Sequence, residues 1–169
     1  MRLMHQGLRQ RGNMAFVPFH NYFPEVGHRE TRSITVPPGS ALGLPAGEYG
    51  FLEFYCDEPG CDCRRVLFYV VARDRTGVQA VIGWGWEDVE FYLRWSGYSS
   101  RADAMEMKGP ALNRGSPATE LAPALVELVR NVLLKDPAYV ERIKRHYRMV
   151  REKVDGPKRR KRGKPKKRR

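Results

Sequence analysis

Alternation of hydrophobic and polar residues, interrupted by short turn signals, predicts a β-sheet in the middle of the chain. Four segments have the length and the aromatic and β-branched content of strands: residues 48–56 (EYGFLEFYC), 65–73 (RVLFYVVAR), 78–84 (VQAVIGW) and 89–95 (VEFYLRW). Residues 74–77 (DRTG) form a turn signal between the second and the third segment. Because the four segments follow one another closely, we expect an antiparallel meander, with residues 31–36 as a further short strand.

A helical period replaces this alternation in the last third of the chain. Leucine and valine recur at positions 121, 125, 128 and 132, which predicts an amphipathic helix whose regular part begins near Thr119. Asp136 followed by Pro137 is a typical helix start, and apolar residues spaced by three and four from 140 to 154 predict a second helix. We expect both helices to cover the same face of the sheet.

Residues 14–47 are rich in proline, glycine and aromatic residues. Prolines at this density remove backbone donors, so outside residues 31–36 we expect an irregular segment that wraps over the core. The whole pattern predicts an α+β fold: an antiparallel four- to five-stranded meander sheet, covered by two C-terminal helices and preceded by an irregular Pro-rich N-terminal segment.

The composition divides the chain into three parts. Residues 1–13 (MRLMHQGLRQRGN) are basic and acid-free, and we interpret them as an extension before a possible native start at Met14, with a mitochondrial presequence as the alternative. Residues 14–155 form one α+β domain, and residues 156–169 a polybasic tail. No run of about 18 apolar residues is present, which argues against a membrane-spanning helix. The three cysteines lie within eight residues, unlike a secreted disulfide framework, so we predict a reducing, cytoplasmic location.

The tail accounts for most of the net charge of +12. The first 155 residues hold 21 of the 31 basic residues and all 19 acidic ones, a net charge of +2. With no apolar side chain to bury, we expect the tail to be disordered. Its cationic side chains favour the phosphate backbone of RNA or DNA over a membrane surface. They are Lys158, Arg159, Arg160, Lys161, Arg162, Lys164, Lys166, Lys167, Arg168 and Arg169.

Three cysteines in the spacing C-x4-C-x-C are the most chemically specific feature of the sequence. Cys56 ends one predicted strand, and Cys61 and Cys63 precede the next. Pro59 and Gly60 reverse the chain between them, so the three sulfurs should converge at the tip of a hairpin. Sulfur ligands in this arrangement suit zinc. Free thiols, or one strained disulfide, are the alternative interpretation.

Structural zinc usually has four ligands, so a fourth must come from elsewhere. His146 can face inward from the second helix, and we rank it first; His20 ranks second. A water molecule or a substrate in the fourth position would instead make the site catalytic. An iron–sulfur cluster is a minor alternative, since it too usually needs four cysteines.

The sequence thus favours a metal-stabilised module that binds nucleic acid, most of all RNA, non-specifically through its tail. Arg64, Arg65 and Trp86 are candidate contacts on the folded domain. No motif of a known catalytic class is present, and no small-molecule substrate is indicated, so a binding role is favoured over an enzyme. The alternatives are a small metal-dependent enzyme with an open metal site, and a protein-interaction domain whose cysteine turn is purely structural.

Overall fold

In the part of the chain that the computed structural model describes, residues 16–97 and 100–156, six strands form one antiparallel sheet. They are β1 (Phe16–Pro18), β2 (Arg32–Val36), β3 (Gly47–Cys56), β4 (Arg65–Ala72), β5 (Val78–Gly85) and β6 (Ala111–Leu112). The order is β1-β3-β4-β5-β6, and β2 also pairs with β3. Strand β1 pairs with residues 54–56 and β2 with residues 47–51, so the two short strands share one edge of β3.

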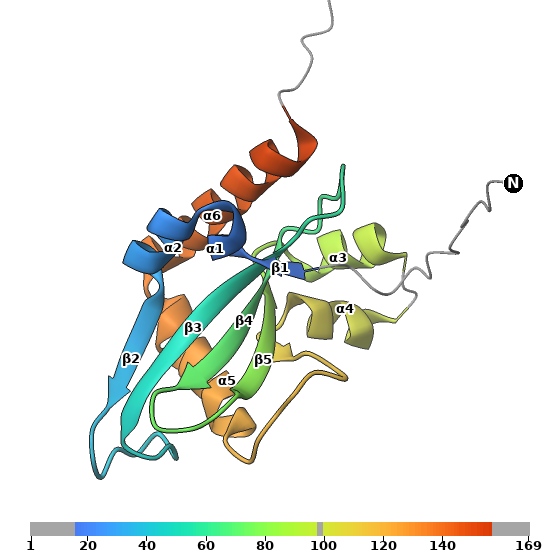
Figure 1. The fold of residues 1–169 in the computed structure, drawn as a ribbon. Helices are drawn as coiled ribbons and strands as arrows, with labels where there is room; N and C mark the ends of the chain where they lie inside the picture. The colour runs from blue at the N-terminus through green and yellow to red at the C-terminus, as the bar shows by residue number, and fades with distance from the viewer. Residues whose placement is uncertain (1–15, 98–99, 157–169) are drawn as a thin grey trace, which may run out of the picture.

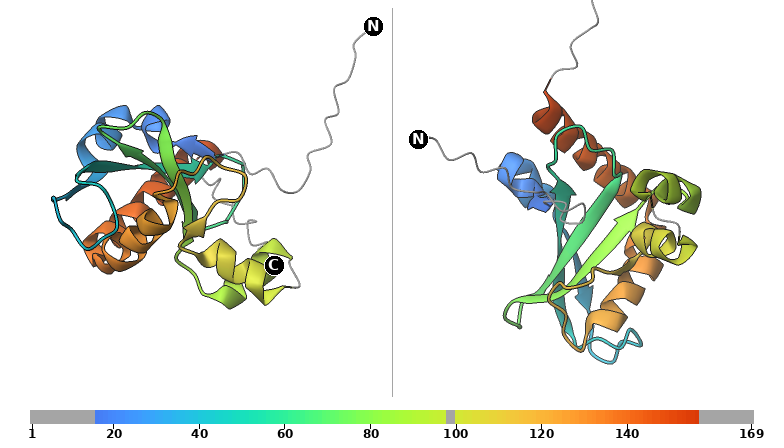
Figure 2. Two further views of the ribbon diagram at one scale, coloured as in Figure 1. Left: turned by 90° about the horizontal axis from the view of Figure 1, so that it is seen from below. Right: turned by 90° about the vertical axis from the view of Figure 1, so that its right-hand side faces the viewer.

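Helices cover one face of this sheet and lie beside two of its edges (Figure 1). They are α1 (Phe19–Tyr22), α2 (Pro24–Glu30), α3 (Val89–Ser96), α4 (Arg101–Lys108), α5 (Ala122–Asn131), the short 3-10 helix η1 (Leu133–Lys135) and α6 (Pro137–Asp155). Helices α1 and α2 lie near β3, and α3 and α4 lie near β5. Helices α5 and α6 lie behind the sheet in Figure 1, as expected for the two C-terminal helices. Figure 2 shows α3 and α4 as a separate pair beside it.

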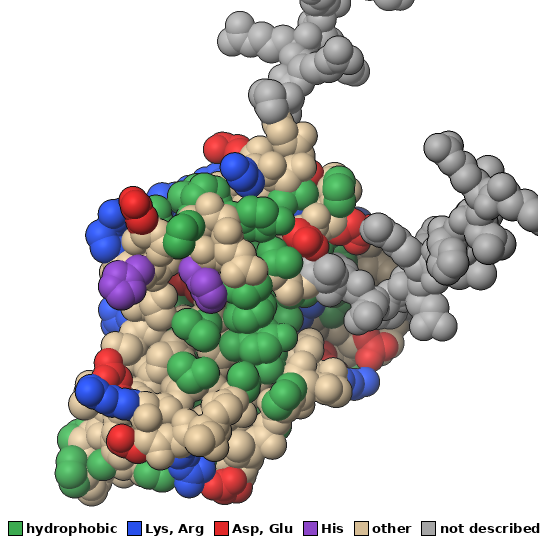
Figure 3. Space-filling view, in the orientation of Figure 1, with side chains coloured by type: hydrophobic (Ala, Val, Ile, Leu, Met, Phe, Trp, Pro, Cys, Tyr) green, Lys and Arg blue, Asp and Glu red, His purple; other side chains and the backbone are tan. Residues whose placement is uncertain are grey.

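Side chains along β3 alternate between a buried face of the sheet and a more open one. Its alternate residues Tyr49, Phe51, Glu53 and Tyr55 are buried toward the helices, as the period of two requires. They join a core that includes side chains of β4, β5, α5 and α6. On the opposite face, hydrophobic side chains gather over the middle of the sheet (Figure 3).

Two local signals in the sequence fold as predicted. The turn between β4 and β5 contains Gly77 at φ +74°, and the buried side-chain amide of Gln79 donates to the carbonyl groups of Thr76 and Gly77 at 3.1 and 3.0 Å. At the start of α6, the Asp136 carboxylate accepts hydrogen bonds from the backbone N–H groups of residues 138 and 139. Each of these contacts joins residues at most four positions apart, so the sequence alone was enough to predict the turn and the helix start.

The prediction of a strand over residues 89–95 is wrong, because these residues form α3. The Asp88 carboxylate caps this helix by accepting a hydrogen bond from the Phe91 N–H at 2.7 Å, and Gly97 ends it at φ +69°. Tyr92 is fully buried against Gly85, where a Cβ atom would lie 2.0 Å from the tyrosine hydroxyl oxygen. The absence of a side chain at Gly85 thus makes room for the Tyr92 ring, and with it for α3.

The expectation of an irregular N-terminal segment is wrong for residues 16–30, which fold as β1, α1 and α2. Pro24 occupies the first position of α2, where a helix needs no backbone donor. The expected strand over residues 31–36 is present as β2. Helix α4, at residues 101–108, was not predicted, although Ser100 caps it by accepting from the Asp103 N–H at 3.3 Å. The predictions for residues 1–13 and for the tail from residue 157 onward lie outside the described residues.

Candidate metal centre

The cysteine turn joins β3 to β4 as the sequence predicts. The Cys61 N–H donates to the Glu58 carbonyl oxygen at 3.1 Å, and Gly60, at φ +74°, lies at the third position of this turn. Proline at the second position and a glycine with positive φ at the third are the usual pair for a type II turn. The chain therefore doubles back immediately after Cys56, which brings the later cysteines to the end of β3.

The three cysteines converge into one group whose sulfur atoms all lie within 4.8 Å of one another. Cys56 and Cys63 are fully buried, Cys61 is half-buried, and none forms a disulfide. Hydrogen bonds from the other two thiols hold the pKa of the Cys56 thiol well below its usual range. The same hydrogen bonds raise the pKa values of Cys61 and Cys63. Three soft donors at this separation can hold a metal ion.

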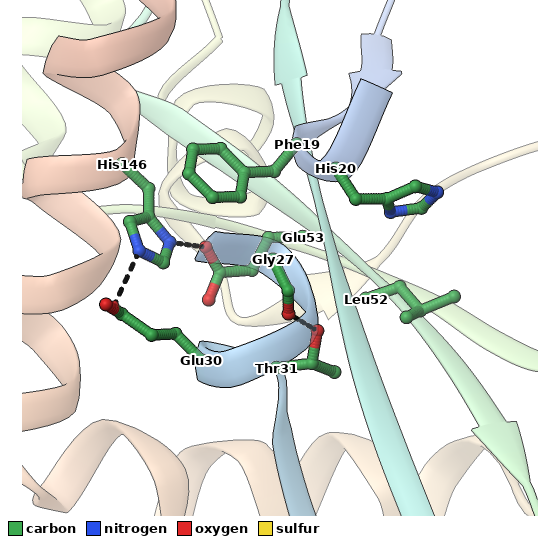
Figure 4. Close-up of a pocket in the computed structure, with 8 residues that line it drawn as sticks. All are labelled: Phe19, His20, Gly27, Glu30, Thr31, Leu52, Glu53 and His146. Atoms are coloured by element: carbon green, nitrogen blue, oxygen red, sulfur yellow. Dashed lines mark hydrogen bonds and ion pairs between the residues drawn. The ribbon is translucent and has the colours of Figure 1, made fainter. Parts of the chain in front are cut away.

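The structure does not bring His146 to this group, contrary to our first choice of fourth ligand. Its Nδ1 lies 2.7 Å from Oε2 of Glu53, and its Nε2 lies 3.0 Å from Oε2 of Glu30 (Figure 4). Its ring stacks on Phe19, with ring centroids 4.0 Å apart. His20, our second choice, lines the cavity beside His146. Among the described residues, the metal-ligand group contains the three cysteines alone.

His146, Glu53 and Glu30 form a second buried polar group, which we call the His146 centre. The sequence did not point to its buried member Glu53. Oε2 of Glu53 accepts a hydrogen bond from the Tyr55 hydroxyl at 2.6 Å and lies 2.7 Å from Nδ1 of His146. Its Oε1 is buried and has no hydrogen-bond partner among the described atoms. A cavity of about 10 Å³ adjoins it, about the space of one water molecule. An acid among the inward-facing aromatic residues of β3, between Phe51 and Tyr55, was the available signal.

Glu30 links this buried centre to the surface. Burial opposes ionisation of its carboxyl group, but the hydrogen bond from His146 and the charges of Arg145, His146 and Arg142 outweigh that effect and lower its pKa. Arg145 also forms an ion pair with Glu30. Each ring nitrogen of His146 lies within hydrogen-bonding distance of a carboxylate, Nδ1 of Glu53 and Nε2 of Glu30. This histidine is therefore engaged away from the cysteines.

The candidate nucleic-acid contacts near the cysteine turn already have intramolecular partners. Arg64, at a left-handed φ of +49°, is held by Asp62 at 2.9 Å and by Glu87 at 3.0 Å. Arg65 is buried, and its Nε donates to the Met107 carbonyl oxygen at 2.8 Å. Trp86 packs edge-on against Tyr147, with ring centroids 5.0 Å apart. Contact with nucleic acid through these three side chains remains a prediction.

Among the helices of the described residues, none combines the length and the apolar character that a membrane crossing requires. No protein-family model matches the chain, and no curated protein or solved structure shows significant similarity to it. The cysteine group is therefore the feature of the molecule from which a function can be inferred.

Proposed function

We propose that this chain is a zinc-stabilised α+β module that binds nucleic acid, RNA above all, through its polybasic tail. The observation that carries the metal part is the convergence of three cysteine sulfurs within 4.8 Å at the end of a strand. Two of them are fully buried, where a thiolate needs a compensating positive charge. A divalent metal ion supplies that charge, and thiolate ligands favour zinc over hard cations such as magnesium.

The proposed binding of nucleic acid rests on the basic residues of the tail. Ten basic residues and no acidic one follow α6 in the sequence, while the rest of the chain is nearly neutral. Such a segment binds phosphate by releasing counterions, so its affinity depends steeply on salt and little on base sequence. In this proposal the cysteine centre stabilises the fold and the tail supplies the affinity.

One experiment on the untagged full-length protein tests both parts. Metal analysis should find about one zinc ion per chain in the wild type. The Cys56→Ser variant should contain much less zinc. Binding to single-stranded RNA should weaken steeply as salt rises, and a variant with the ten basic tail residues replaced by glutamine should lose that dependence. A chain without metal would refute the metal part, and unchanged salt-dependent binding by the tail variant would refute the tail part.

The number of protein ligands favours a metal-dependent enzyme as the second candidate. Catalytic zinc sites commonly have three protein ligands and a water molecule, and the described residues provide three sulfurs with Cys61 half-buried. X-ray absorption of the zinc-loaded protein separates the candidates. Three sulfurs with an exchangeable oxygen ligand favour the enzyme, whereas three sulfurs with a histidine nitrogen favour a closed structural site.

A further inference from the structure

One face of the last three turns of α6 contacts the cysteine turn from Cys56 to Arg64. Tyr147, Arg151 and Asp155 are spaced four residues apart, so they lie above one another on three successive turns of the helix. We refer to these three residues as the α6 row. Each of them contacts the chain between the end of β3 and the start of β4, and these contacts connect segments more than 80 residues apart.

Arg151, at the centre of the α6 row, holds the backbone of the cysteine turn at three points. Its Nη1 donates to the carbonyl oxygens of Glu58 and Cys61 at 2.8 and 2.9 Å, and its Nη2 donates to that of Cys56 at 2.5 Å. Two of the three acceptors thus belong to the cysteines themselves. A planar guanidinium can make such forked contacts with a fixed geometry, which constrains where the two sulfur-bearing residues lie.

The other two members of the row hold the ends of the same turn. The Asp155 carboxylate accepts a hydrogen bond at 2.8 Å from the N–H of Gly60, at the tip of the turn. The Tyr147 hydroxyl accepts one at 3.4 Å from the N–H of Arg64, the residue after the last cysteine. Arg151 lies 3.8 Å from Asp155 and over the ring of Tyr147, so the row is also connected internally.

Charge favours the same arrangement. Three thiolates and one divalent cation have a net charge of −1, which the guanidinium of Arg151 balances. Groups outside the ligand sphere that orient ligands in this way commonly change metal affinity by 10- to 100-fold.

We propose that metal binding by the cysteines is coupled to docking of the last three turns of α6, with Arg151 as the positioning residue. This inference rests on the proposed metal function of the cysteine group. Because coupling of binding free energies is reciprocal, the metal stabilises the docked helix end as much as the docked helix raises the affinity for the metal. The helix ends at Asp155, directly before the polybasic segment, so the metal state controls the anchor of the tail.

Arg151→Ala in the full-length protein tests the coupling, with Arg148→Ala as the matched control on the exposed side of the same helix. We expect zinc affinity, measured by competition with a chromophoric chelator, to fall by about 10- to 100-fold in Arg151→Ala and to stay unchanged in Arg148→Ala. Zinc should slow amide hydrogen exchange of residues 148–155 in the wild type and in the control, and much less in Arg151→Ala. Equal affinity and equal exchange in all three proteins would overturn the inference.

Arg151→Lys separates geometry from charge and provides a second test if the alanine variant does not fold. Lysine keeps the positive charge but loses the forked donors, so we expect an intermediate loss of zinc affinity. A lysine variant with wild-type affinity and exchange would overturn the positioning role. If the wild type binds no zinc, the proposed metal function itself fails, which is a different result from equal binding by all variants.

Discussion

Two buried polar centres join the same strand to the same helix, and they differ in how their polar atoms are satisfied. Glu53 and His146 connect the middle of β3 to the middle of α6, and the cysteine turn meets the last turns of α6. Both nitrogens of His146 and one oxygen of Glu53 have protein partners. The three cysteine sulfurs lie within 4.8 Å of one another, and their thiols hydrogen-bond to each other. A buried polar group with internal partners needs no ligand, whereas a cluster of thiols is best explained by one.

One polar atom of the His146 centre departs from this pattern. Oε1 of Glu53 is buried without a hydrogen-bond partner among the described atoms, beside a cavity of about 10 Å³. An unpaired carboxylate oxygen is costly, and a single water molecule fits both the space and the need for a donor. The contacts of the His146 centre thus account for its polar groups, whereas the cysteine group is the candidate metal site.

The largest expected effect tests the structural role of the His146 centre. His146→Ala removes the partner of a buried carboxylate, and breaking such a pair commonly costs about 3–5 kcal/mol of unfolding free energy. Urea denaturation measures this loss, and His28→Ala, exposed on α2, should change stability by less than about 0.5 kcal/mol. If the variant remains folded, its zinc affinity should equal that of the wild type. A loss below about 1 kcal/mol, or a loss of zinc binding by the folded variant, would contradict the division between the two centres.

The next effect tests whether the cysteine group depends on a ligand for its stability. At zinc concentrations about 1,000 times the Kd, binding contributes about 4 kcal/mol to stability, which Cys63→Ser should abolish. Thermal or urea unfolding with and without a chelator measures that contribution. The metal-free wild type and metal-free Cys63→Ser should differ by only about 1 kcal/mol, because serine replaces the thiol with a group of similar size. An equally large difference without metal would show that packing, not ligation, explains the site.

The smallest effect concerns Glu30, on the outer side of the His146 centre. Because its pKa is lowered in the folded protein, its ionised form stabilises the fold above the unfolded-state pKa, and this contribution is lost as pH falls through the lowered folded pKa. Stability of the wild type should therefore fall below about pH 4.5, and Glu30→Gln should show a flatter acid limb. At neutral pH the substitution should cost about 1 kcal/mol. An acid limb identical to that of the wild type would exclude Glu30 as a contributor.

Local chemistry determined much of this protein from its sequence. The turn at Pro59 and Gly60, the convergence of the three cysteines and the Asp136 cap each depend on residues close together in the chain. Alternation of apolar and polar residues predicted strands at residues 48–56, 65–73 and 78–84, which the structure has as β3, β4 and β5, and helical periodicity predicted the last helix. The α3 segment shows the limit of alternation: residues 89–95 fit a strand or a helix, and the capping at Asp88 and Gly97 fits the helix.

Only the tertiary structure decided which distant residues meet. His146 pairs with Glu53, 93 residues earlier, rather than with the cysteines, and Arg151 reaches carbonyl groups at least 90 residues away. Helical periodicity placed His146 on the inner side of α6, but it could not say which residue of β3 lies opposite. The register of a helix on a sheet is set by packing over the whole core, and the identity of a buried partner depends on that register. The sequence by itself therefore specified the cysteine group, and the fold decided what surrounds it.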